Sequence, residues 1–376
     1  MKVVTRLTSL LPQNEMEFID LKAQQKRLGK RLNARINKVL SHGQYIMGPE
    51  VSELEEKLAK HVETKHCITV SSGTDALLIS LMALGIKQGD EVITTSFSWI
   101  STAEVIVLSG ARPVFVDVDS KTCNIDSKRI EEKITHKTKA IMPVSLYGQP
   151  SEMKKINQIA AKYKIPVIED GAQSFGATLG GKKSCNLSLI GCTSFFPSKP
   201  LGGYGDSGAI FTNDDSIAKI SKEIRLNGQE NKNKFNRIGI AGRMDTMQAA
   251  ILLAKFEIFH DEVERRVSIG GRYDSMFDEC GIEHVQLLSN TKSVYAQYTI
   301  FSSKRDYLMQ ELSKNGIPSA IYYASTMNNQ IPYKRFGFKT KIASKCSQRV
   351  LSIPMHPYLT KRDQDKIVKI ITDFES

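Results

Sequence analysis

The chain has 376 residues, of which 41% are hydrophobic and 24% charged, and its formal net charge at pH 7 is +12. This composition is typical of a globular protein with a large core, and it excludes a disordered chain. A membrane-spanning helix needs about eighteen consecutive apolar residues, and the sequence contains no such run.

The N-terminal residues and the cysteines favour a cytoplasmic protein. Residues 1–16 have a broken apolar stretch without a signal-peptide cleavage site, so we expect no membrane partner. Cysteines occur at positions 67, 123, 185, 192, 280 and 346. They form no C-x-x-C pair, and free thiols are commoner than disulfides in cytosolic enzymes, so we expect them to bind no metal.

The positive net charge suits an anionic partner, which can be nucleic acid, a membrane surface or a phosphorylated small molecule. The basic residues are scattered, however, and aromatic residues do not interleave with the short basic clusters at 133–139 and 229–237. We therefore expect no nucleic-acid partner. The charge favours a nucleotide-like substrate.

From about residue 50, short apolar runs alternate with amphipathic segments, which is the rhythm of βαβ units. The predicted strands are residues 67–71, 91–95, 113–119, 139–148, 165–170, 192–196 and 208–212. The predicted helices are residues 73–85, 101–110, 127–134 and 151–163, followed by one that ends near residue 226. Hydrophobicity in the strands is continuous rather than alternating, which predicts an α/β fold with a mostly parallel sheet.

The pattern changes in the last third of the chain. Residues 245–266 are predicted to form a bridging helix, and beyond about residue 268 the elements become shorter. They include the apolar segment 293–301 and a final helix that begins at Lys361. A smaller C-terminal α+β domain fits this pattern.

Two motifs follow the first two predicted strands. In SSGTDALL (71–78), a free helix N-terminus with Gly73 and Thr74 can bind a phosphate, although an ordinary Ser/Thr helix cap is the alternative. Trp99 follows the next strand and can offer a flat ring for stacking, with core packing as the alternative. Both motifs lie where functional groups of a parallel sheet are expected.

In IPVIEDGAQSFGA (165–177), the strand ends in Glu169 and Asp170, and Gln173 follows. An acid in this place either caps the next helix or holds a cationic ring nitrogen. Ser194 and Lys199 follow the strand 192–196, ahead of glycines at 202, 203, 205 and 208. A loop lysine that reaches water is the ordinary explanation for such a residue.

These motifs are the parts that one pyridoxal 5′-phosphate (PLP) site needs. They supply a phosphate cup, an aromatic ring, a carboxylate for the pyridine nitrogen and a lysine whose amine is poorly solvated and therefore nucleophilic near neutral pH. Their order along the chain supports a single site and favours a catalytic role for Lys199. The predicted cofactor is PLP with its amino form, pyridoxamine phosphate (PMP).

Longer segments carry a resemblance to a known family. They are FIDLKAQ, HGQYIMGPEVSELE, SSGTDAL, GDEVITTSFSW, IEDGAQSFGA, SFFPSKPLGGYGDSGAIFTND, RMDTMQAAIL and SIPMHPYL. On these segments, which run from residue 18 to residue 359, the chain resembles the PLP-dependent sugar-nucleotide aminotransferases of the DegT/DnrJ family. The family's related dehydratases carry histidine where this chain has Lys199.

The resemblance implies a type I (aspartate aminotransferase-like) fold with a mostly parallel seven-stranded sheet, and a homodimer. It also implies a large PLP-binding domain with its bridging helix at residues 16–267 and a small domain at 268–376. Family members begin near M-x-F-I-D-L, so Met16 is an alternative start and residues 1–15 are an N-terminal extension.

The resemblance assigns roles by position. Lys199 and Asp170 are the implied catalytic residues, as the lysine that joins the cofactor and the partner of its ring nitrogen. Arg243 and Tyr323 are the implied substrate-binding residues. The implied cofactor-binding residues are Gly73, Thr74, Trp99, Asp170, Gln173, Ser194 and Lys199.

The segments SCNLS, TSFFPSKPLG, VYAQYT and PMHPYL resemble most the enzymes that aminate UDP-2-acetamido-2-deoxy-3-oxo-glucuronate for surface polysaccharides such as lipopolysaccharide. Glutamate is the amino donor that the resemblance implies. Amination at C4 or of a dTDP-linked sugar is the alternative within the family. A non-catalytic regulator or nucleic-acid binder is the alternative from another class.

The chain departs from the family's pattern at three positions. Ala241 stands before Gly242 where many members have an asparagine that reaches the cofactor phosphate of the neighbouring subunit. Asn227 replaces the histidine of a common R-x-H-G, and Tyr322 replaces the histidine of a His-Tyr pair. These changes leave the identity of the sugar open.

Overall fold

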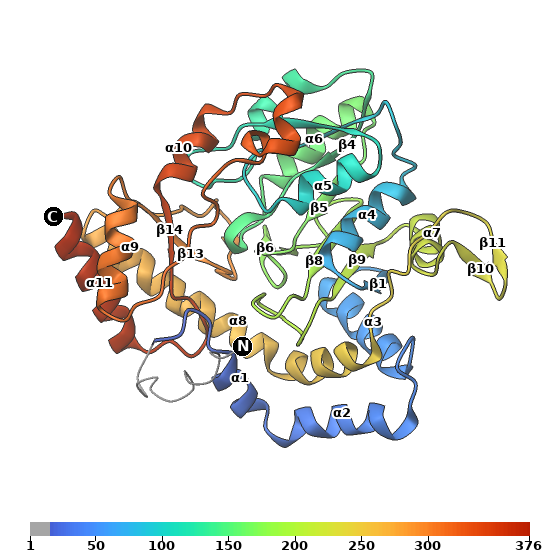
Figure 1. Cartoon of the computed structure of the whole chain (residues 1–376), viewed down its shortest axis with the longest axis horizontal. Coiled ribbons are helices and arrows are strands. Elements are labelled where there is room, and N and C mark those ends of the chain that lie inside the picture. Colours follow the sequence, from blue (N-terminus) through green and yellow to red (C-terminus); the bar gives the residue numbers. More distant parts are fainter. Residues whose placement is uncertain (1–15) are drawn as a thin grey trace, which may run out of the picture.

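Seven strands form the central sheet of this protein, whose computed structural model describes residues 16–376 (Figure 1). The expected extension at residues 1–15 lies outside the described residues. The strands are β1 (His66–Val70), β2 (Glu91–Thr95), β3 (Arg112–Val116), β4 (Thr138–Met142), β5 (Ile168–Asp170), β8 (Ile190–Ser194) and β9 (Gly208–Thr212). Hydrogen bonds group them as β3-β2-β4 and β5-β8-β9-β1, and parallel bridges such as Ile141 with Val167 join the two groups.

All the strands of this sheet run in one direction except β9, which is antiparallel to both β8 and β1. The mostly parallel seven-stranded sheet is therefore confirmed. The carboxyl ends of β1, β2, β5 and β8 lie at one edge, because parallel strands end on the same side.

Helices cover both faces of the sheet (Figure 1). Those of the N-terminal part are α1 (Leu21–Leu28), α2 (Lys30–His42), α3 (Pro49–Val62), α4 (Gly73–Ala83), α5 (Ser101–Leu108), α6 (Met153–Tyr163) and α7 (Asp215–Arg225). Successive strand residues point to opposite faces, so Ile168 packs with α4, α5 and α7 while Val167 packs with α6. On that second face, Phe211 of β9 packs with α3 and the long helix α8.

Helix α8 (Thr246–Glu279) joins the two parts of the molecule. Its first half packs in the core with Phe211, whereas Tyr273 and Phe277 pack in the core of the C-terminal part. The predicted end near residue 266 is wrong, because the helix continues through Gly270. A Cβ atom at Gly270 would lie 2.5 Å from the ring of Tyr295, so a glycine allows this close helix packing. The predicted domain boundary after residue 267 falls inside α8.

The C-terminal part contains an antiparallel strand pair with helices beside it. Its elements are β13 (Tyr298–Phe301), β14 (Val350–Ile353), α9 (Arg305–Lys314), α10 (Lys341–Arg349) and α11 (Lys361–Glu375). Thr360 caps α11 and forms a capping box with Asp363, which explains why this helix begins where the sequence predicted.

Short strands complete the chain. Strands β6 (Thr178–Leu179), β7 (Lys182–Lys183) and β12 (Thr291–Lys292) form a small sheet, and β10 (Gln229–Asn231) and β11 (Lys234–Phe235) form a hairpin that projects from the body (Figure 1). None of the helices within residues 16–376 is both long enough and apolar enough to cross a membrane.

Several predicted elements differ in detail. Residues 127–134 form two 3-10 turns rather than a helix, since this short segment buries only Ser127 and Ile130 and cannot sustain longer helical order. Strand β4 ends before Pro143 and β5 begins after Pro166, because proline has no N–H group for the ladder. Strand β3 ends at Val116 rather than at residue 119.

Candidate active site

The predicted site residues come from the carboxyl ends of the strands and from the first turns of α4 and α5. Gly73 and Thr74 begin α4 after β1, and Asp170 ends β5. Ser194 ends β8, and Lys199 lies in the turn that follows. The topology thus places these segments at one edge of the sheet, as expected for a parallel arrangement.

The N-terminus of α4 and the end of β8 touch each other. A Cβ atom at Gly73 would lie 2.7 Å from Cβ of Ser194, so only glycine leaves room at this position. The Ser72 hydroxyl caps α4 by accepting a hydrogen bond from the N–H group of Asp75. The Thr74 hydroxyl donates to Ser101 at 2.9 Å. Hydroxyl groups and a helix N-terminus thus surround a place suited to a phosphate.

The carboxylate of Asp170 is buried and oriented by two donors. The Thr102 hydroxyl donates to Oδ2 at 2.9 Å, and the backbone N–H of Ala172 donates to Oδ1 at 3.1 Å. Burial raises the pKa of Asp170, although these hydrogen bonds and the charge of Lys199 act in the opposite direction. A buried acid that is held in this way can pair with a cationic ring nitrogen.

Glu169 points away from Asp170 because neighbouring strand residues face opposite sides of the sheet. Its carboxylate accepts hydrogen bonds from the Ser184 hydroxyl at 2.7 Å and from the backbone N–H of Cys185 at 2.8 Å. The two acids that the sequence places side by side therefore have different surroundings. Glu169 ties the strand to the loop at 184–185.

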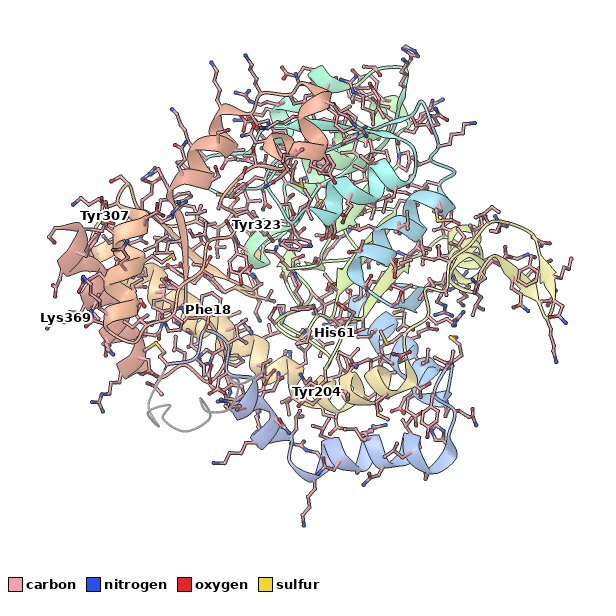
Figure 2. The ribbon with its side chains drawn as sticks, viewed as in Figure 1. Phe18, His61, Tyr204, Tyr307, Tyr323 and Lys369 are labelled. Carbon is pink, nitrogen blue, oxygen red and sulfur yellow. The ribbon has the colours of Figure 1, made fainter. Side chains whose placement is uncertain are left out.

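Gln173 connects the strand end to the C-terminal part. Its side-chain oxygen accepts from the backbone N–H of Tyr147 at 2.8 Å, and its Nε2 donates to the Tyr323 hydroxyl at 3.1 Å. The Tyr323 ring lies 6.1 Å from the rings of both Trp99 and Phe97. Figure 2 shows Tyr323 near the middle of the molecule. Tyr323 therefore joins the predicted cofactor residues.

Lys199 is partly buried, and no residue within 16–376 accepts a hydrogen bond from its amine. Its backbone N–H donates to the carbonyl of Phe196 at 2.9 Å, which fixes the turn. Burial lowers the pKa of Lys199 to about 8, although the Asp170 carboxylate acts in the opposite direction. An amine with this pKa can gain and lose a proton near neutral pH.

Trp99 is 60% exposed, so it does not pack in the core as the alternative interpretation required. A large exposed aromatic ring beside Tyr323 is available for stacking. Sequence reasoning missed Thr102, which orients Asp170. Its position one turn after the SFSW motif at the start of α5 is the signal that points to this edge of the sheet.

Arg243 follows a residue that is hydrogen-bonded to the chain just before Gly73 and Thr74. The carbonyl of its neighbour Gly242 accepts from the Ser71 N–H at 2.9 Å, and the Arg243 guanidinium donates to the Asn227 side chain at 3.1 Å. Within residues 16–376, no hydrogen bond joins Arg243 to Lys199 or Tyr323. Ala241 is exposed.

These residues fit PLP. Gly73 lets the N-terminus of α4 approach Ser194 closely. A buried carboxylate, Asp170, and a desolvated lysine, Lys199, belong to the same edge of the sheet. Gly73, Thr74 and Ser194 would hold the phosphate, and Asp170 and Lys199 would hold the ring and its carbonyl group.

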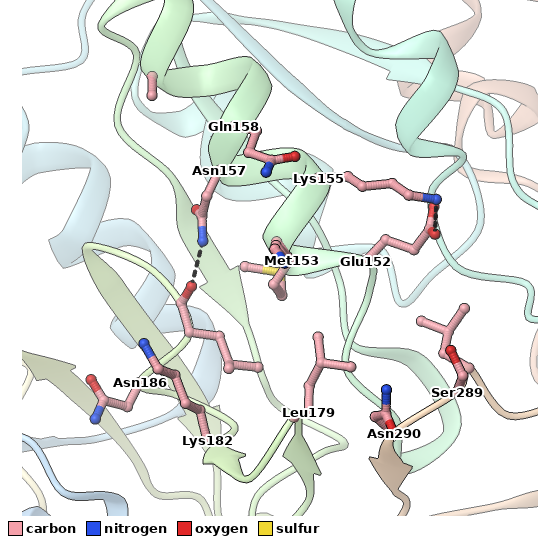
Figure 3. Close-up of a pocket in the computed structure, with 15 residues that line it drawn as sticks. Glu152, Met153, Lys155, Asn157, Gln158, Leu179, Lys182, Asn186, Ser289 and Asn290 are labelled. Atoms are coloured by element: carbon pink, nitrogen blue, oxygen red, sulfur yellow. Dashed lines mark hydrogen bonds and ion pairs between the residues drawn. The ribbon is translucent and has the colours of Figure 1, made fainter.

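A separate surface pocket of about 830 Å³ lies between α6 and residues 288–290 (Figure 3). Its lining includes Met153, Leu179 and Lys182, and the Asn157 side chain on one wall donates to the carbonyl of Leu187 at 2.7 Å. None of the predicted site residues lines this pocket.

Comparisons with known proteins agree over nearly the whole chain. The model of the DegT/DnrJ/EryC1/StrS aminotransferase family matches residues 26–372. A Pseudomonas aeruginosa protein named UDP-2-acetamido-2-deoxy-3-oxo-D-glucuronate aminotransferase is 51% identical over 344 residues, which cover 92% of this chain and 96% of that protein.

Two solved structures have the same fold. An aminotransferase of this family from Brucella abortus has a TM-score of 0.92 and 41% identity, and the match covers 96% of this chain and 100% of that one. NtdA from Bacillus subtilis, crystallised with the cofactor PMP bound, has a TM-score of 0.89 and 31% identity, with coverage of 96% and 85%.

Proposed function

This chain belongs to the DegT/DnrJ/EryC1/StrS aminotransferase family, and from that premise we propose that it transfers an amino group to the keto carbon of a nucleotide sugar with PLP as cofactor. The proposed substrate is UDP-2-acetamido-2-deoxy-3-oxo-glucuronate and the proposed amino donor is glutamate. The proposal for the substrate rests on the 51% identity, over 92% of this chain, to the Pseudomonas aeruginosa protein that has this substrate in its name. The product would be a 3-amino sugar for surface polysaccharide, including lipopolysaccharide.

Some residues of the site bind the cofactor and others transfer protons. Gly73, Thr74 and Ser194 bind the phosphate, while Asp170 keeps a proton on the ring nitrogen. When bound, the cofactor carries the amino group and accepts the electron pair released beside the reacting carbon. As general acid and base, Lys199 would move the proton between the cofactor carbon that carries the amino group and the keto carbon of the sugar, for which its pKa of about 8 is suited.

The protein is proposed to act as a cytoplasmic homodimer. Trp99 beside the site, and Phe235 and Ile238 of the projecting hairpin region, are more than half exposed. Large exposed apolar side chains beside the site and on a projecting hairpin are suited to a surface that a second subunit covers. All six cysteines are free thiols, as is usual in a reducing compartment.

Two other functions have less support. Amination at C4, or of a dTDP-linked sugar, would use the same catalytic residues, so only the sugar contacts separate it from the proposed reaction. A non-catalytic regulator or nucleic-acid binder would have no use for a desolvated lysine opposite a buried aspartate.

One titration tests the proposed function. Purified holoenzyme is mixed with glutamate, and the visible spectrum should change as the cofactor becomes PMP. The PMP enzyme is then given 3-keto and 4-keto UDP and dTDP sugars in turn. Recovery of the first spectrum with the 3-keto uronate alone is the expected result. The proposal would be contradicted by a protein that is colourless, whose spectrum does not change with glutamate, and that binds DNA in a salt-sensitive way.

We expect the variant Arg243→Lys to separate charged from neutral sugars. A guanidinium grips a carboxylate with two parallel hydrogen bonds, and an ammonium keeps the charge but loses this geometry. The value of kcat/KM should therefore fall far more for the 3-keto uronate than for its 6-hydroxy analogue. The half-reaction with glutamate, which involves no sugar carboxylate, serves as the control. Equal losses on both sugars would assign Arg243 to the contact with Asn227 instead.

We expect Ala241→Asn to tighten cofactor binding. The family's usual amide contact from the neighbouring subunit is absent here, and one hydrogen bond to a charged group contributes about 1.5–3 kcal/mol. The Kd for PLP, measured by absorbance after dialysis, should fall about tenfold or more. Ala241→Val, which adds volume but no donor, is the matched control. An unchanged Kd in the asparagine variant would mean that another group already fills the role.

A further inference from the structure

A fully buried lysine of α8 lies close to the turn that carries Lys199. Lys255 of α8 is 1% exposed, and its Nζ has no hydrogen-bond acceptor within residues 16–376. The Nζ atom instead lies 4.3 Å from the centroid of the Tyr204 ring. Burying an ammonium without an acceptor is costly, and an apolar side chain of similar length would avoid that cost. The Tyr204 ring is therefore the group that can stabilise the buried ammonium.

The state of this lysine agrees with a cation–π contact. Burial lowers the pKa of Lys255 to about 8, and the charge of Glu262 acts in the opposite direction. The side chain is therefore mostly an ammonium at pH 7. Desolvated contacts between an ammonium and an aromatic face are stronger than exposed ones.

Tyr204 belongs to the loop at residues 195–207, which contains Lys199. The backbone of this loop is closed by hydrogen bonds from the Phe195 N–H to the Ser207 carbonyl at 2.8 Å and from the Gly203 N–H to the Phe195 carbonyl at 2.7 Å. Lys199 lies inside the turn that the second bond closes. Any movement of Gly203 and Tyr204 therefore reaches the lysine through a few residues of backbone.

Helix α8 holds this loop at two points on one face. The Gln248 side-chain oxygen accepts from the Tyr204 N–H at 2.8 Å, and a Cβ atom at Gly203 would lie 2.7 Å from that oxygen. Lys255 lies two helical turns further along and holds the ring of the same tyrosine. Figure 2 shows Tyr204 against this part of α8.

We propose that Lys255 is a positioning residue: its contact with the Tyr204 ring fixes the loop at 195–207 and thereby the place of the Lys199 amine. The inference rests on the proposed function for the role of Lys199. It adds that the buried charge of Lys255 connects α8 to the loop at 195–207. The same helix packs with the C-terminal part through Tyr273 and Phe277.

The test measures the Lys199 amine directly, without cofactor. Apo-protein is treated with trinitrobenzenesulfonate over a range of pH, and modification of Lys199 is followed by peptide mass spectrometry. The variants are Lys255→Met, Tyr204→Leu and the conservative Tyr204→Phe. Lys369→Met of α11 makes the same chemical change at an exposed position and is the matched control. Figure 2 shows Lys369 at the far edge of the molecule.

A loosened loop exposes Lys199 to water, so the Lys199 pKa should rise toward its ordinary value in both Lys255→Met and Tyr204→Leu. A rise of one unit would lower the neutral fraction of Lys199 at pH 7 about tenfold. In the holoenzyme, kcat should fall about tenfold while KM for glutamate changes by less than about twofold. Tyr204→Phe keeps the aromatic face, so its Lys199 pKa and its kcat should both stay close to those of the parent.

Other outcomes overturn the inference. If neither variant changes the titration of Lys199 and only the unfolding midpoint falls, Lys255 is an ordinary core residue. If Lys255→Met changes the titration of Lys199 and Tyr204→Leu does not, the contact between Lys255 and the Tyr204 ring is not what positions Lys199. Should Lys255→Met fail to fold, the two Tyr204 variants decide the question, because Tyr204 is 38% exposed. The apo titration is independent of turnover, so failure of the proposed function would be seen separately.

Discussion

Lys199→Ala should abolish turnover while the protein stays folded. The substitution removes the amine that joins the cofactor and the group that carries the proton, so kcat should fall by at least about a thousandfold. The variant should still bind PMP, because Gly73, Thr74, Ser194 and Asp170 remain. Single-turnover measurements with PMP-loaded variant and the keto sugar would show the loss directly. Normal turnover in this variant would refute the assignment of the site.

The pH dependence of stability provides the control for folding. The pKa of Lys199 is about 8 in the folded protein and 10.5 as its ordinary value. Between these values the unfolded chain binds more protons, so stability rises with pH, and below about pH 8 the full cost of the buried charge is present. Apo Lys199→Ala lacks this cost. It should therefore be at least as stable as the parent at pH 7, with a difference that shrinks above pH 8.

Asp170→Asn should have the second largest effect on the reaction. An amide keeps the size of the side chain, and its oxygen can accept from the Ala172 N–H while its NH2 donates to the Thr102 hydroxyl, but it cannot hold a proton on the ring nitrogen by charge. Loss of one preorganised electrostatic partner costs about 10²–10³ in kcat, and we expect a value at the upper end. The visible spectrum of the bound cofactor should also lose the features of a protonated ring across neutral pH.

Glu169→Gln is the matched control for this prediction. It makes the same change one residue earlier, where the side chain faces Ser184 and Cys185. The burial that raises the pKa of Glu169 means that this variant alters stability, but kcat should stay within about threefold of the parent. If both variants lost activity equally, a general disturbance of β5 would explain the effect better than contact with the cofactor.

The main architecture could be predicted from the sequence because its physical signals are local. Continuous apolar runs indicated strands buried on both faces, and the strand that ends at Asp170 is one of them. Glycine next to Thr74 and the pair of acids at 169–170 are visible as motifs because each lies where a strand ends. The extent of β5 could not be predicted as well, since Pro166 interrupts the ladder within an otherwise apolar run.

The rest of the site depends on contacts between distant parts of the chain. Nothing in the local sequence shows that Tyr323 reaches Gln173, or that Thr102 donates to Asp170. Likewise, Gly270 resembles the end of a helix until its partner Tyr295 is known. Each of these features is set by tertiary packing, which overrides local propensity.

The antiparallel strand β9 has a consequence for how the chain acquires its activity. Strand β1 has no neighbour in the sheet until β9 arrives, and His66 then pairs with Thr212 across a very long loop of sequence. Closing such a loop is slow, because much chain entropy is lost before the contacts form. Gly208 of β9 pairs with Val70 of β1 and with Ser194 of β8, so the phosphate cup between Gly73 and Ser194 is complete only when β9 lies between these two strands. Cofactor that binds there would stabilise only chains whose sheet is complete, and in this way it would select them against misfolded ones.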